Sequence, residues 1–193
     1  MAIFAPLVIT AILFSGDFLV LWTGNKALAL ATTPIVQFIL IGTALNGIMH
    51  FPYALQLANG ATSLAIVTNI ILIIIMVPLT IVLTKYYGVI GGAAAWAILN
   101  GLYVVIGTLI THRFLLRGHG FNWMLHDILV PLLISVVAIA FGRVLLLNTL
   151  DDHLYRLMLS TVFAFISFFG IVFLSSTSRN IFLKKINTFI RME

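Results

Sequence analysis

Long apolar runs alternate with short polar segments along this chain, and the spacing predicts a set of membrane-spanning helices. A helix needs about 20 mostly apolar residues to cross a hydrocarbon core about 30 Å thick, because each residue adds about 1.5 Å. Six stretches meet that length: Ile3 to Trp22, Thr33 to Leu55, Ser63 to Leu83, Val89 to Thr111, Ile128 to Leu147 and Leu154 to Leu174. The expected fold class is all-α and polytopic, since a helix satisfies its own backbone hydrogen bonds in lipid.

Short polar segments separate these runs, and each predicts a turn near the membrane surface. They are TGNK at 23–26, ANGAT at 58–62, KYYGVIGG at 85–92, RGHGFN at 117–122 and NTLDDH at 148–153. Aromatic residues fall at the same predicted ends, where amphipathic rings favour the headgroup region. These residues are Trp22, Tyr86, Tyr87, Trp123 and Tyr155.

Polar residues form a stripe on the second predicted span. Asn46, His50 and Tyr53 are spaced by four and then three residues, so they share one face of the helix. Pro52 has no amide hydrogen and leaves the carbonyl of Ile48 without its usual partner. We therefore expect a bend in the helix beside this stripe.

The fourth predicted span carries a second stripe, formed by Trp96, Asn100, Tyr103, Gly107 and Thr111. One interpretation is structural, because asparagine, glutamine and glycine residues join membrane helices by hydrogen bonds and close backbone approach. The other is a hydrated path for a polar solute between bent helices. Periodicity leaves both interpretations open.

Two further polar residues lie inside apolar sequence. Asn69 is the lone strongly polar residue of the third predicted span, and Asp17 is an acid embedded in FSGDFLVLW, near the predicted outer end of the first. A polar side chain in hydrocarbon is costly unless it faces protein or water, so both positions are informative.

Composition excludes several classes of protein. Of 193 residues, 62% are hydrophobic and only 8% charged, against roughly 25% charged in a soluble domain. The chain has no cysteine, which excludes a disulfide framework, a thiolate metal site and a thiol nucleophile. The net charge of +5 comes from basic residues in short segments between apolar runs. That pattern favours an anionic membrane surface and not nucleic acid.

The distribution of lysine and arginine predicts the orientation. Arg113, Arg117, Arg179, Lys184, Lys185 and Arg191 fall on one side of the predicted spans, and Lys26, Lys85 and Arg156 fall on the other. The richer side is expected in the cytoplasm, which places both termini there. Arg143 lies within a span, close enough to the outer end for its side chain to reach the surface. The basic tail at 176–193 is either a short amphipathic helix on the inner leaflet or a frayed end.

Catalytic motifs are not found in the sequence. His112, His119, His126 and Asp127 gather around one loop without an HExxH pattern, which is typical of surface histidines near headgroups. Neither GxSxG nor a phosphate-binding glycine loop occurs. We expect no catalytic residue, metal or cofactor.

The order of several segments resembles a known family. LVLWTGN (19–25), LNGIMHFPYALQLANGAT (45–62), IIIMVPLTIVLTKYYGVIGGAAAWAILNGLYVVIG (73–107) and THRFLLRG (111–118) are similar to the bacterial polysaccharide and O-antigen flippases. That family belongs to the superfamily of multidrug, oligosaccharidyl-lipid and polysaccharide exporters. The resemblance covers 19–118 in detail and the last two predicted spans by hydropathy.

The resemblance implies a fold and a function. Family members have 12 to 14 helices in two lobes, so residues 1–112 would be the last four helices of a second lobe, 113–175 a cytoplasmic loop and two additional helices, and 176–193 a cytoplasmic tail. The implied activity moves an undecaprenyl-diphosphate-linked oligosaccharide across the bacterial inner membrane, without a cofactor, together with a missing N-terminal lobe or a second subunit. The polar stripes would line the solute path through Asn46, His50, Tyr53, Gln56, Asn100 and Tyr103. Asp17 is a candidate for ion coupling, or it pairs with Lys26.

Three other functions compete with this interpretation. A multidrug exporter lobe would be favoured by acids inside the cavity, and Asp17 is the one embedded acid. A non-transporting scaffold could anchor polysaccharide-assembly enzymes through the basic tail. An intramembrane enzyme, such as a lipid-linked sugar transferase, ranks last because paired acids are missing.

Overall fold

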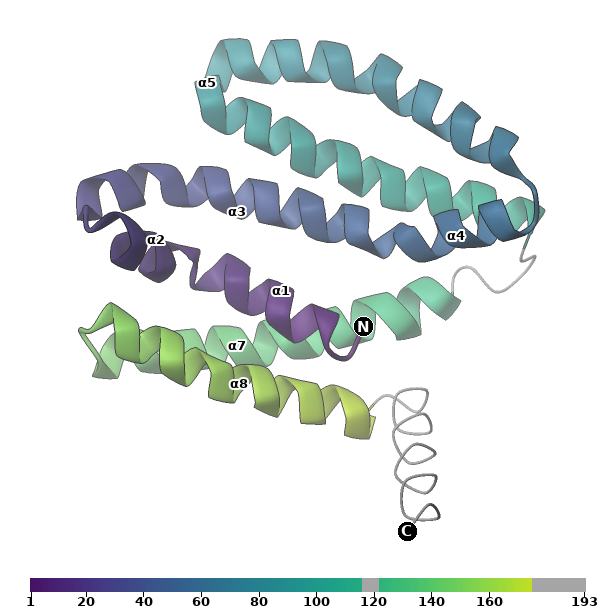
Figure 1. Cartoon of the computed structure of the whole chain (residues 1–193). Coiled ribbons are helices and arrows are strands. Elements are labelled where there is room, and N and C mark those ends of the chain that lie inside the picture. Colours follow the sequence, from purple (N-terminus) through teal and green to yellow (C-terminus); the bar gives the residue numbers. More distant parts are fainter. Residues whose placement is uncertain (116–121, 175–193) are drawn as a thin grey trace. The chain divides into compact units, whose positions relative to one another are not determined.

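The computed structural model describes residues 1–115 and 122–174 of the chain, and in these ranges every regular element is a helix (Figure 1). The elements are α1 (Phe4–Leu13), α2 (Ser15–Thr23), α3 (Lys26–Ile48), α4 (His50–Ala58), α5 (Thr62–Phe114), the π-helical segment η1 (Trp123–Leu129), α7 (Val130–Thr149) and α8 (His153–Leu174). The all-α fold is thus confirmed. The predicted tail at 176–193, with Arg117 and His119, lies outside the described residues.

Four helical stretches within the described ranges are long and apolar enough to cross a membrane. They are Lys26–Ala58, Thr62–Phe114, Trp123–Thr149 and His153–Leu174, and the bent pair α1–α2 makes a fifth if it counts as one span. The chain is therefore a polytopic membrane protein. The sequence predicted six spans, and the structure has five stretches. The numbers differ because α5, with 53 residues, contains two of the predicted spans.

The two predicted spans inside α5 are separated at Gly88. Its backbone angles, φ 60° and ψ −140°, are not helical, and residues with a Cβ rarely adopt them. Figure 1 shows α5 folding back on itself at this point, so that its two arms run side by side. Gly91 then passes so close to the carbonyl group of Leu83 that a Cβ there would collide with it. The turn predicted at KYYGVIGG is confirmed.

A bend was predicted beside Pro52, and the structure has a break in the helix at Met49, where α3 ends and α4 begins. The amide of Met49 donates to the carbonyl of Asn46, three residues back, at 3.0 Å. Pro52 has no amide to donate to Ile48, so the regular pattern of helical hydrogen bonds is broken over this turn. The break lies within the polar stripe; the predicted bend itself stays a prediction, because Lys26–Ala58 is not among the stretches bent by more than 40°.

The first predicted span was expected to be one helix over Ile3 to Trp22, and this was wrong. The chain bends there by 60° between α1 and α2, and the hydroxyl of Ser15 donates to the carbonyl of Ile12 at the bend. Phe14 sits at the corner, buried against Ile139 and Leu146 of α7. Hydropathy did not reveal the bend, because the contacts that stabilise it come from residues more than a hundred positions away.

Contacts divide the chain into two compact units. The terminal unit joins Met1–Lys26 to the region from Asn122 onward and contains α1, α2, η1, α7 and α8, whereas the central unit, Ala27–Phe121, contains α3, α4 and α5. In the terminal unit α7 packs on both α1 and α8. Its helices approach closely at Gly142, where a Cβ would overlap the ring of Phe163. These two units differ from the domains that the family resemblance implies, which divide the chain between residues 112 and 113. The implied domain division stays a prediction.

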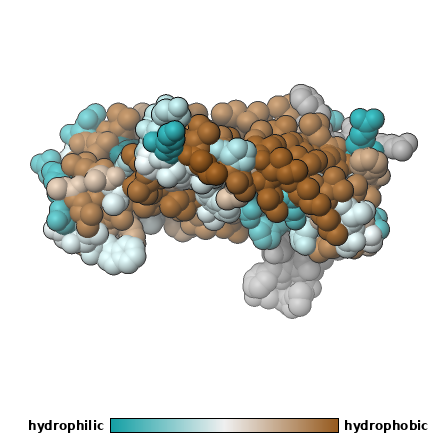
Figure 2. All heavy atoms as spheres, turned by 90° about the horizontal axis from the view of Figure 1, so that it is seen from above, coloured by the Kyte–Doolittle hydropathy of each residue, from teal (hydrophilic) through white to brown (hydrophobic). Residues whose placement is uncertain are grey.

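Apolar side chains cover most of the surface seen in Figure 2. They include Ile74, Val137 and Leu174, each more than two-thirds exposed. A contiguous apolar surface of this extent is typical of contact with lipid and not with water. Trp22, Tyr86 and Tyr87 are also well exposed and stand at helix ends or turns, as expected for residues at the membrane interface.

Candidate functional site

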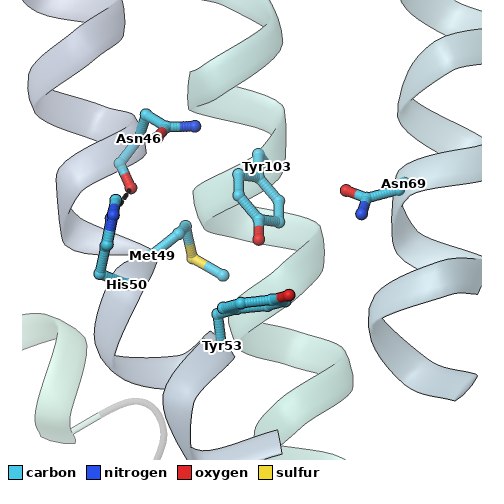
Figure 3. Close-up of a pocket in the computed structure, with 6 residues that line it drawn as sticks. All are labelled: Asn46, Met49, His50, Tyr53, Asn69 and Tyr103. Carbon is cyan, nitrogen blue, oxygen red and sulfur yellow. Dashed lines mark hydrogen bonds between the residues drawn. The ribbon is translucent and has the colours of Figure 1, made fainter. Parts of the chain in front are cut away.

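A polar cavity of about 270 Å³ lies inside the central unit (Figure 3). Its lining is drawn from α3, α4 and both arms of α5, and it adjoins the interruption at Met49. The lining residues are Asn46, Met49, His50, Tyr53, Asn69 and Tyr103. Four of the six predicted path residues therefore line one cavity.

The helix interruption places the first part of this lining. Asn46 ends its stripe on α3, and His50 and Tyr53 begin α4, so the three side chains stay on one side across the break. The imidazole Nδ1 of His50 lies 3.3 Å from the carbonyl oxygen of Asn46. That carbonyl also accepts the amide of Met49, so it holds both the backbone and the imidazole at the break.

The turn at Gly88 places the second part of the lining. It folds α5 so that Asn69 comes from one arm and Tyr103 from the other. In Figure 3 the amide of Asn69 extends toward the ring of Tyr103, whose hydroxyl points toward Tyr53. The polar groups of the cavity are amides, phenols and an imidazole, and none of the described lining residues is an acid, a lysine or an arginine. Such groups donate and accept hydrogen bonds to a neutral polar solute.

The remaining two predicted path residues are buried between helices instead. Asn100 is 2% exposed; it accepts a hydrogen bond from the amide of Asn46 at 2.9 Å and donates to the carbonyl of Trp96 at 2.8 Å. Gln56 is equally buried and donates to the hydroxyl of Thr111 at 2.7 Å. Both side chains have their hydrogen-bond partners within the protein, as expected of polar groups that join membrane helices.

Glycine lets the same helices approach each other. A Cβ on Gly42 would overlap the indole ring of Trp96, and a Cβ on Gly107 would overlap the side chain of Met49. Asn100 and Gln56 make hydrogen bonds between helices, whereas His50, Tyr53 and Tyr103 border the cavity. Asn46 does both, since it lines the cavity and donates to Asn100. Contact with a solute stays a prediction.

Asn69 and Met49 line the cavity but were not among the predicted path residues. The sequence could have indicated Asn69 as a cavity residue, since it is the lone strongly polar residue in its apolar run. It could not have indicated Met49, because methionine is common in apolar helices and the side chain reaches the cavity through the break between α3 and α4.

A second polar group lies in the terminal unit around Asp17, which is 4% exposed. Its Oδ1 atom lies 2.6 Å from Nδ1 of His153 and 3.0 Å from Nη1 of Arg156, and its Oδ2 atom lies 3.9 Å from Nη1 of Arg143. The predicted alternative, an ion pair with Lys26, was wrong, because the bend at Phe14 turns α2 toward α8. We name these four residues the charge cluster.

The two arginines of the charge cluster are held differently. Arg156 donates through Nε to the carbonyl of Leu150 at 2.9 Å and through Nη2 to that of Asp151 at 3.0 Å. Arg143 lies over the ring of Phe14, 5.5 Å from its centroid. The contacts of Asp17 to three side chains of α7 and α8 join these helices to α2, which favours a structural role for Asp17; its role in ion coupling stays a prediction.

The other titratable residues singled out from the sequence make local contacts. Nδ1 of His112 lies 2.9 Å from the carbonyl of Thr108, and that of His126 lies 3.3 Å from the carbonyl of Asn122. Over the ranges that the structure covers, no three histidine, aspartate or glutamate side chains come close enough together to hold a metal ion.

Comparison with known proteins gives no further assignment: no protein-family model, curated protein or solved structure matches the chain significantly.

Proposed function

We propose that this chain is part of a flippase that moves an undecaprenyl-diphosphate-linked oligosaccharide across the bacterial inner membrane during polysaccharide biosynthesis. The observation that carries the proposal is the polar cavity of the central unit. It lies in the segments that resemble the flippase family, and its lining joins PYALQLANG to AWAILNGLY.

The chemistry of the cavity suits a sugar. Saccharides present many hydroxyl groups and no net charge, and the lining offers amide, phenol and imidazole groups that pair with hydroxyls. Small-molecule pockets usually enclose roughly 300–1,000 Å³, and a cavity of about 270 Å³ lies just below that range, so it suits a short part of an oligosaccharide at a time. A long oligosaccharide would pass through in sequence.

The broken helices suit alternating access. Transporters commonly bind their solutes beside discontinuous helices, which bend where the backbone pattern is interrupted. Here Met49 separates α3 from α4 at the cavity wall, so α4 can tilt relative to α3. Tyr53 would move with α4 while Asn46 stays with α3, and the cavity would widen or close between them.

A complete path needs a second wall. The cavity is open, and in the flippase family two lobes enclose the solute. We propose that an N-terminal lobe or a second subunit supplies the facing wall, with both chain termini in the cytoplasm as the lysine and arginine distribution predicts. A multidrug exporter is less well supported because the six lining residues that the structure describes include no acid.

Photo-crosslinking in membranes tests the proposal whether or not the chain transports alone. Benzoylphenylalanine in place of Tyr53 should capture a radiolabelled lipid-linked oligosaccharide, whereas the same group in place of Tyr86, which is exposed beside the turn of α5 and is not among the lining residues of the cavity, should not. Equal labelling at both positions, or labelling at neither, contradicts the proposal and favours a scaffold.

Complementation of a flippase-deficient strain tests transport itself. If the chain, with its partner lobe, restores surface polysaccharide, His50→Ala combined with Asn46→Ala should reduce the yield. The matched control is His126→Ala, since His126 makes the same 3.3 Å contact to a carbonyl four residues back but does not line the cavity. Undiminished polysaccharide with the double variant would contradict the cavity assignment.

A further inference from the structure

The charge cluster of the terminal unit contains more positive than negative groups. Arg143, Arg156 and His153 surround a single carboxylate, Asp17. With both arginines charged, the cluster keeps a net charge of at least +1 even when the imidazole is neutral. A buried ion pair within a membrane protein usually balances its charges. The excess positive charge of this cluster would be balanced by a bound anion.

The cluster lies close to the ends of its helices. Arg143 stands six residues before the end of α7 at Thr149, and Asp17 stands six residues before the end of α2 at Thr23, which in each case is about 9 Å along the axis. His153 and Arg156 occupy the first turn of α8. The ends of membrane-spanning helices lie near the boundary between hydrocarbon and headgroups, where the abundant anions are lipid phosphates.

One group of the cluster lacks a hydrogen-bond acceptor. Nη1 of Arg143 is buried, and among the described residues it has no hydrogen-bond partner; its closest acid atom, Oδ2 of Asp17, is 3.9 Å away. Leaving a buried charged donor unsatisfied costs more than leaving a neutral one. Arg156, in contrast, is held by three hydrogen bonds, so Arg143 is the group available to a ligand.

An apolar groove of about 660 Å³ lies in the same unit, between α1 and α8. Its lining includes Leu7, Thr10, Ala11, Thr161, Ala164 and Phe168, and its surface is almost entirely apolar. Such a groove excludes a polar solute and accepts a hydrocarbon chain.

The groove leads toward the charge cluster along both helices. On α1, Leu7, Thr10 and Phe14 follow a spacing of three and four residues and share one face, and the ring of Phe14 lies under Arg143. On α8 the lining begins at Thr161, about a turn and a half beyond Arg156. The hydroxyl of Thr10 is a second buried polar atom without a hydrogen-bond partner in the described part of the chain. It lies between the apolar groove and the cations.

We propose that the terminal unit binds one anionic phospholipid, with its phosphate against Arg143 and Arg156 and an acyl chain in the groove between α1 and α8. The phosphate oxygens accept from Nη1 of Arg143 and balance the excess charge. A lipid ester carbonyl, which lies between phosphate and acyl chain, accepts from the hydroxyl of Thr10. The site is separate from the cavity of the central unit and does not depend on the proposed transport function.

Native mass spectrometry of the purified chain in detergent tests the site, with phosphatidylglycerol and phosphatidylcholine of identical acyl chains as the probes. We expect phosphatidylglycerol to be retained in preference to phosphatidylcholine. Arg143→Gln should weaken the binding of phosphatidylglycerol about fivefold, the effect of one basic residue near an anionic lipid. Arg143→Lys, which keeps the charge, should weaken it less. The matched control is Arg113→Gln, which removes an exposed arginine at the end of α5 and should change nothing.

A second variant tests the groove. Ala11→Phe places a ring in the groove from an exposed position, and it should weaken binding of both lipids without changing the charge. Arg143→Gln leaves the hydrogen bonds of Asp17 to His153 and Arg156 intact, so we expect this variant to fold. Gel filtration checks that it does. Equal retention of the two lipids, or unchanged affinity in Arg143→Gln, overturns the proposal. So does displacement of the lipid by inorganic phosphate together with no effect of Ala11→Phe, since this indicates an anion site without an acyl chain.

Discussion

Asp17→Asn removes the one negative charge of the charge cluster while keeping the size and shape of the side chain. The asparagine still presents one oxygen to His153 and Arg156, but the interactions become neutral. Arg143 and Arg156 then face each other without a counterion, and the side chain between them is 4% exposed, so water screens little of the repulsion. We expect a marked loss of stability.

The magnitude follows from the individual contacts. The bonds at 2.6 Å to His153 and 3.0 Å to Arg156 are charge-assisted, and each contributes about 1.5–3 kcal/mol. The contact to Arg143 is 3.9 Å long and its side chain is 31% exposed, so it adds at most about 1 kcal/mol. Because asparagine retains part of each bond, we expect a loss of about 3 kcal/mol, at the lower end of the values for a broken buried ion pair.

The free energy of unfolding in mixed micelles, followed by tryptophan fluorescence, measures this loss. Asp152→Asn is the matched control: Asp152 is an exposed acid that accepts from the amide of Leu154 at the start of α8, and asparagine serves equally well as such a cap. Arg156→Gln should cost nearly as much as Asp17→Asn, and the double variant should cost less than the sum. If Asp17→Asn is no more destabilising than Asp152→Asn, or the two losses add fully, the charge cluster does not stabilise the fold as argued.

The helix contacts of the central unit yield three further predictions, each measured by the same unfolding assay. Gly42→Ala should destabilise the protein by about 1–3 kcal/mol because its Cβ would overlap an indole ring, whereas Gly101→Ala, whose nearest neighbour is 4.0 Å away, should be nearly neutral; equal losses would contradict the close approach. Gly88→Ala should cost about 1–3 kcal/mol through backbone strain at φ 60°, and Gly92→Ala, at a helical position with its nearest atom 3.5 Å away, should not. Asn100→Ala removes a buried bond between helices and should cost about 1 kcal/mol; no measurable loss would show that the bond is replaced by water.

Local signals in the sequence predict the interruptions of the central unit well. Pro52 removes one amide, and Gly88 permits a backbone conformation closed to other residues. Both effects act within a few residues, so the break at Met49 and the fold of α5 follow from the chain alone. Periodicity likewise places Asn46, His50 and Tyr53 on one face, and the structure keeps them there across the break.

Contacts between distant segments were not predictable in the same way. Asn46 and Asn100 have the same polarity and the same kind of stripe, yet the second is buried and the first reaches the cavity. Periodicity gives the face of a helix but not the helix that packs against it. The bend at Phe14 was missed for the same reason, since an apolar run has one hydropathy whether it is straight or bent by 60°.

The partners of Asp17 also have a consequence for how the protein is made. His153 and Arg156 follow it in the sequence by 136 and 139 residues, so the ribosome has completed α1 to α7 before either counterion exists. A lone acid opposes insertion by about 2.5–3.5 kcal/mol at a helix centre and by less near a helix end, where Asp17 lies. During synthesis we therefore expect the α1–α2 pair to insert weakly at first, and to be held more firmly once α7 and α8 bring Arg143, His153 and Arg156 to Asp17.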